Sequence, residues 1–120
     1  MNLLFVDPKS DDPYDGESVH REPVGGTEAS LVTVAEGLAR THAVVIEQKG
    51  RVKPYRSPAG PEYLPMHSAG AFGGQSADAV VILRRMRLAP AYRRRFPQAR
   101  LFVWIHNWQR PEVIWKRLAL

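Results

Sequence analysis

The sequence predicts an α/β fold with a Rossmann-like, mostly parallel sheet and helices on both of its faces. Two observations predict it. The apolar strands, such as residues 3–6 and 79–83, are continuous rather than alternating, as in strands buried on both sides. Helical patterns separate these strands, and such alternation is typical of parallel strands joined by crossover helices. A chain of 120 residues has room for one domain, which we expect to span residues 1–120.

The first half of the chain predicts strand, loop, helix and strand in that order. Residues 3–6 form a buried strand, and residues 8–25 are rich in Pro, Asp, Ser and Gly and predict a long mobile loop. Thr27 is the expected N-cap of a helix, because apolar residues then recur at positions 31, 32, 35, 38 and 39. Residues 43–46 predict the second buried strand.

The second half predicts a basic loop, two further strands, a short helix, a last strand and a last helix. The ranges are 48–61 for the loop, 62–66 and 79–83 for the strands, 86–95 for the short helix, 100–105 for the last strand and 111–120 for the last helix. A Gly-rich loop is expected over residues 67–77, and a break near Pro90 stays open. Pro111 suits the first turn of the last helix.

Composition limits the class of protein. Without cysteine, disulfides and thiol chemistry are excluded. The N-terminus has no basic region before its apolar run and reaches Asp7 at once, so it does not predict a signal peptide, and we expect a cytoplasmic protein. Residues 1–40 carry eight acidic residues against three basic ones, whereas residues 41–120 carry four acidic against fourteen basic.

A glycine pair at the start of the first long helix is the main candidate for a binding site. Gly25 and Gly26 let a ligand approach the backbone, while Thr27 and Glu28 occupy the helix start, where free N–H groups and the helix dipole favour an anion. The pair predicts a cradle for a phosphate or sugar diphosphate. It does not match a dinucleotide site, which needs three spaced glycines directly after the first strand.

The order of these elements resembles the N-terminal domain of the GT-B glycosyltransferases of family 4. The resemblance is carried by the glycine pair with Glu28, the short turn through Thr41 and His42, and the last strand closing on His106 and Trp108. It implies the acceptor-side domain of a retaining enzyme that uses a nucleotide-sugar as co-substrate, with a sugar or lipid-linked acceptor and no metal.

The resemblance also implies roles for single residues. Gly25 and Gly26 would lie by the donor diphosphate, and His106 would approach the transferred sugar as the catalytic histidine. In this family a second domain holds most of the donor. The sequence therefore looks like half of an enzyme, inactive without a C-terminal domain or partner chain.

A second hypothesis is a non-enzymatic anion-binding module. Residues 84–95 contain no acidic residue, and their arginines would attract nucleic acid or an anionic membrane. In the second case the protein would lie peripherally at the inner face of the membrane. The resemblance places this segment where family members approach membranes. Each feature also has a purely structural alternative: a turn at Gly25, a hydrogen-bonded His106, a solvated basic face. The arginines concerned are Arg84, Arg85, Arg87, Arg93, Arg94 and Arg95.

Overall fold

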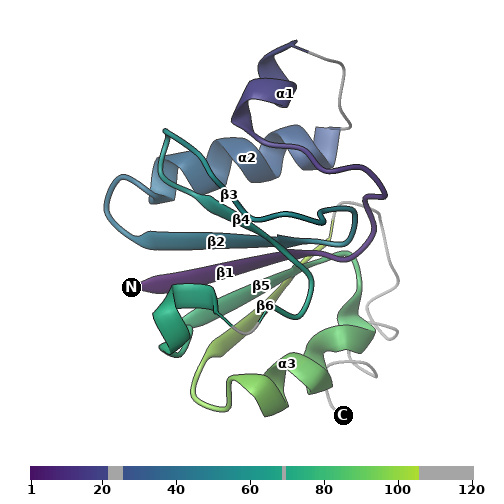
Figure 1. Cartoon of the computed structure of the whole chain (residues 1–120). Helices are drawn as coiled ribbons and strands as arrows, with labels where there is room; N and C mark the ends of the chain where they lie inside the picture. The colour runs from purple at the N-terminus through teal and green to yellow at the C-terminus, as the bar shows by residue number, and fades with distance from the viewer. Residues whose placement is uncertain (22–25, 69, 106–120) are drawn as a thin grey trace.

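The computed structural model describes residues 1–21, 26–68 and 70–105 (Figure 1). Within them a six-stranded sheet is flanked by helices on both faces. In chain order the elements are β1 (Asn2–Asp7), α1 (Gly16–Arg21), α2 (Gly26–Leu38), β2 (Ala43–Gln48), β3 (Tyr55–Arg56), β4 (Glu62–Pro65), the 3₁₀ turn η1 (Ala71–Gly74), β5 (Ala79–Leu83), the 3₁₀ turn η2 (Met86–Leu88), α3 (Ala89–Arg95) and β6 (Arg100–Trp104).

The sheet is mostly parallel, as the sequence predicts. Its strand order is β3-β4-β2-β1-β5-β6, and among the described strands only β3, which runs against β4, is antiparallel. The central strand β1 lies with Leu4 between Val45 of β2 and Val80 of β5. The parallel strands therefore end together at one edge, where Asp7, Gln48 and Leu83 close β1, β2 and β5.

Two apolar layers hold the helices to the sheet. On one face, Leu31 and Ala35 of α2 pack in a cluster with Phe5 and Ile46. On the other face, Tyr92 of α3 packs in a cluster with Leu4. Figure 1 shows α2 and α3 on opposite sides of the sheet. The helical face expected from the sequence spacing is confirmed, because Leu31, Val32 and Ala35 are buried.

Several local predictions are wrong. Residues 8–25 are not one loop, because α1 forms within them, and the basic loop over 48–61 contains the short strand β3. The segment 86–95, for which a break near Pro90 was open, divides directly before Pro90 into η2 and α3, and Pro90 lies in the first turn of α3, where a fixed φ suits the helix start. α2 already includes Gly26, so Thr27 is a buried first-turn residue and not the N-cap. The helix expected over 111–120 lies outside the described residues.

Candidate functional site

The start of α2 lies at the carboxyl edge of the sheet, where parallel α/β sheets bind their ligands. Gly26 is exposed, and a Cβ added there would meet no described atom within 4 Å. Packing therefore does not require glycine at this position. The first N–H groups of a helix lack intrahelical acceptors, so the backbone here can bind an anion. Gly25, the other half of the pair, lies outside the described residues.

Glu28 presents an unsatisfied acceptor in the first turn of α2. Its Oε2 is buried and has no hydrogen-bond donor among the described residues. Burial and the neighbouring Asp7 carboxylate raise the pKa of the Tyr14 phenol, and the negative charge of the Glu28 carboxylate adds to this effect. A buried carboxylate oxygen without a donor costs free energy, and a ligand hydroxyl or N–H would supply the missing partner.

Asp7, the last residue of β1, is committed to its own loop. Asp7 is 3 % exposed, and its carboxylate accepts hydrogen bonds from the backbone N–H groups of Lys9 at 3.1 Å and Ser10 at 3.2 Å, and from the hydroxyl of Tyr14. The carbonyl of Tyr14 in turn accepts a hydrogen bond from Gln48 Nε2 at 2.8 Å. The first part of the predicted mobile loop is therefore anchored to the ends of β1 and β2.

Arg84 follows β5 at the same edge. Its backbone has a φ of 65°, a left-handed conformation that is uncommon for arginine and that concentrates at functional sites. Its N–H donates to the carbonyl of Trp104 at 3.0 Å, which fixes the turn. Its Nε is buried and has no acceptor in the part of the chain that the structure describes. Arg84 and Glu28 thus offer an unsatisfied donor and an unsatisfied acceptor at one edge.

The other predicted basic residues do not form a single solvated row. Arg93 Nη1 donates to the carbonyls of Pro97 at 3.1 Å and Ala99 at 2.7 Å, so it closes the end of α3. Arg87 and Arg94 are exposed, and Arg85 is half-buried. The sixth arginine, Arg95, turns inward and binds a buried carboxylate.

That carboxylate belongs to Glu47 of β2, which is not among the residues that the sequence motifs indicate. Glu47 is fully buried, and its Oε1 accepts hydrogen bonds from the hydroxyl of Tyr92 at 2.9 Å and from Arg95 Nη1 at 3.2 Å. Its Oε2 lies 3.0 Å from the same Nη1, in an ion-pair contact without hydrogen-bond geometry. Arg95 Nη2 donates to the carbonyl of Ser68 at 2.5 Å, so this network joins β2, α3 and the segment after β4.

His106 lies outside the described residues, as does the end of the predicted last strand beyond Ile105. Among residues 1–21, 26–68 and 70–105, no group of three or more histidine, aspartate and glutamate side chains is placed to hold a metal ion. None of the described helices is long and apolar enough to cross a membrane.

Comparison with known proteins adds no relative. No protein-family model, curated protein or solved structure matches the chain. What is established is the fold: a mixed α/β domain with a mostly parallel, Rossmann-like sheet.

Proposed function

We propose that the chain is the acceptor-side half of a retaining glycosyltransferase that uses a nucleotide-sugar, with its site at the carboxyl edge of the sheet. One observation carries the proposal: the start of α2 combines an open Gly26 with the unsatisfied Oε2 of Glu28. A backbone that a ligand can approach suits a diphosphate, and a carboxylate that lacks a donor suits a sugar hydroxyl.

Each group at this edge then has a role. The N–H groups of Gly26 and Thr27 bind a phosphate oxygen, with the helix dipole favouring its charge. Glu28 accepts a hydrogen bond from a hydroxyl of the sugar. The unsatisfied Nε of Arg84 donates to the phosphate or to a sugar oxygen. His106 remains the proposed catalytic residue on the resemblance alone.

The proposal requires a second wall for the site. The family that the sequence resembles holds most of its donor in another domain, so a further domain or a partner chain completes the cleft. The chain by itself then binds donor weakly and transfers no sugar.

Amide chemical shifts test this function. On addition of UDP-glucose or GDP-mannose to the ¹⁵N-labelled chain, the amides of Gly26, Thr27 and Glu28 should shift and saturate. Glu28→Gln keeps the shape of the side chain but removes its charge, and it should weaken binding severalfold. The absence of shifts at these three amides with both nucleotide-sugars would contradict the proposal.

The alternative function, binding to an anionic surface, keeps one supporting observation. Arg87 and Arg94 are exposed on a segment without acidic residues. Binding to vesicles that contain phosphatidylserine should weaken steeply with added salt. It should also fall in the double variant with Arg87→Gln and Arg94→Gln. Vesicle binding that does not change with salt concentration or with the two substitutions would exclude this alternative.

A further inference from the structure

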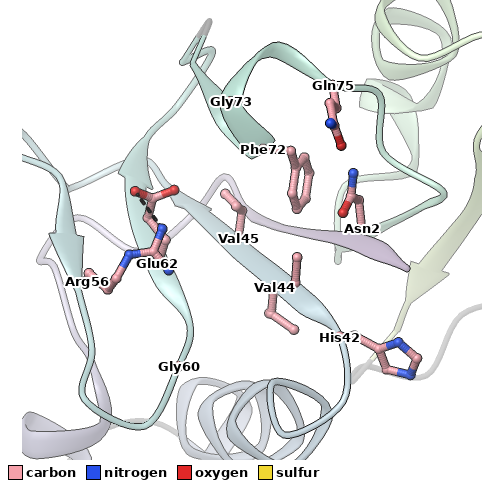
Figure 2. Close-up of a pocket in the computed structure, with 11 residues that line it drawn as sticks. Asn2, His42, Val44, Val45, Arg56, Gly60, Glu62, Phe72, Gly73 and Gln75 are labelled. Atoms are coloured by element: carbon pink, nitrogen blue, oxygen red, sulfur yellow. Dashed lines mark ion pairs between the residues drawn. The ribbon is translucent and has the colours of Figure 1, made fainter.

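A cavity of about 410 Å³ opens at the amino edge of the sheet, at the other end of the strands from Glu28 (Figure 2). It is lined by the beginnings of β1, β2 and β4, by β3 and by the turn η1. Its volume is in the range of small-molecule sites. The proposed glycosyltransferase site does not use this edge, so the cavity needs an explanation of its own.

The cavity has an apolar floor and an aromatic side chain. Val45 is buried beneath it, and the half-buried Phe72 packs against the same apolar cluster, whereas the side chain of Val44 packs on the other face of the sheet. The backbone of Phe72 has a φ of 56°, and Gly73 and Gly74 continue in the same left-handed region. A left-handed φ is disfavoured for phenylalanine. The turn thus holds the ring beside Val45 and Asn2, where a flat ligand can stack on it (Figure 2).

Two carboxamides stand at the rim. Asn2 Nδ2 donates to the carbonyl of Ser76 at 3.1 Å, which fixes the orientation of this amide and leaves its Oδ1 as an acceptor on the side of the Phe72 ring (Figure 2). Gln75 is exposed, and its amide points toward Asn2 (Figure 2). Together the two side chains offer donors and acceptors at one edge, and carboxamides of this kind pair with the edge of adenine.

A weak ion pair forms the opposite wall. Arg56 Nη2 lies 3.4 Å from Glu62 Oε2 across the β3–β4 pair, and the side chain of Arg56 is 67 % exposed. An ion pair this exposed contributes little to stability. The guanidinium keeps further donors that can bind a phosphate, and the carboxylate can accept hydrogen bonds from ribose hydroxyls.

We propose that this cavity is a second ligand site, which binds the adenine end of a nucleotide. The base stacks on Phe72 and presents its edge to Asn2 and Gln75, while the ribose and phosphate lie toward Glu62 and Arg56. This inference does not depend on the proposed transferase function, because the two sites share no residue.

Titration of the ¹⁵N-labelled chain with AMP tests the second site, with adenosine and ribose 5-phosphate as separate arms. AMP and adenosine should shift the amides of Asn2 and of residues 72–75, and ribose 5-phosphate should shift them less. Gln75→Ala and Phe72→Leu should each weaken AMP binding about threefold to tenfold. Gln98→Ala is the matched control, because Gln98 is also exposed and does not line the cavity.

Other outcomes would overturn the inference. Shifts confined to Gly26 and Glu28 would place the nucleotide at the carboxyl edge instead. Shifts caused by ribose 5-phosphate but not by adenosine would remove the role of the base. Equal dissociation constants for the original chain and Gln75→Ala would remove the role of the amide. Weaker binding by Gln75→Ala, in contrast, is not a loss of the fold, because Gln75 is exposed.

Discussion

Tyr92 of α3 donates its hydroxyl hydrogen to Oε1 of the fully buried Glu47 at 2.9 Å. This contact joins the helix on one face of the sheet to the end of a central strand. Hydrogen bonds to a charged acceptor contribute more to stability than hydrogen bonds between neutral groups. Because Glu47 is buried, water does not replace a lost donor.

Tyr92→Phe should therefore lower the free energy of unfolding by about 1.5–3 kcal/mol, the range for a hydrogen bond to a charged group. Tyr63→Phe is the matched control. Tyr63 is also fully buried, but its hydroxyl has no hydrogen-bond partner among the described residues, so its removal should be neutral or stabilising. Urea unfolding of both variants measures the difference. Equal losses of stability would show that the contact with Glu47 contributes nothing specific.

Alkaline pH should destabilise the protein through its buried tyrosines. Burial raises the pKa of Tyr14, Tyr63 and Tyr92 well above the usual value, with neighbouring carboxylates adding to the effect. The pKa values of these phenols are higher in the folded protein than in the unfolded chain. Below about pH 10 the phenols are protonated in both states, and their contribution to the stability of the fold is fully present. Above it the unfolded state loses protons first, so stability should fall as pH rises.

Tyr63→Phe separates this effect from the other groups that titrate at high pH. Removing one such phenol should reduce the fall in stability between about pH 10 and 11 by up to about 1.4 kcal/mol per pH unit. The measurement is urea unfolding at a series of pH values. An unchanged slope in the variant would contradict the raised pKa of Tyr63.

The anchoring of the loop after β1 predicts a local effect. Asp7→Ala removes the acceptor of the buried Tyr14 hydroxyl and of two backbone N–H groups, and it should cost about 2–3 kcal/mol. Hydrogen exchange at the amides of Lys9 and Ser10 should become faster. Asp11→Ala, which removes only an exposed ion pair with Lys49, should change neither quantity. Slow exchange that persists in Asp7→Ala would show that other contacts hold the loop.

The parts of the fold that the sequence predicts are those with strong local patterns. Continuous apolar runs identify β1, β2, β5 and β6, and helical spacing identifies α2. The two residues of β3 carry too little pattern to be seen, and their pairing depends on β4. α1 was missed because Gly16–Arg21 is mostly polar and lies in a stretch that reads as loop.

The candidate site was predictable only in part. The glycine at the start of α2 is visible as a motif, but the unsatisfied atoms of Glu28 and Arg84 depend on which elements pack around them. Glu47 is bound by Tyr92, which is 45 positions away along the chain, and by Arg95, which is 48 positions away. Local sequence therefore does not reveal this network. An acidic residue directly after the apolar run 43–46 was the one available signal.

The proposed ligand site depends most directly on Gly26, and one comparison of dissociation constants tests this role. Gly26 and Gly37 both lie in α2, and a Cβ at either position meets no described atom within 4 Å. Gly37→Ala should stabilise the helix by about 1 kcal/mol, and Gly26→Ala should fold normally. If α2 binds the diphosphate of UDP-glucose, Gly26→Ala should raise the dissociation constant at least about fivefold, because its methyl group occupies the approach to the backbone, while Gly37→Ala leaves it unchanged. Equal dissociation constants for the two variants would contradict a ligand site at the start of α2.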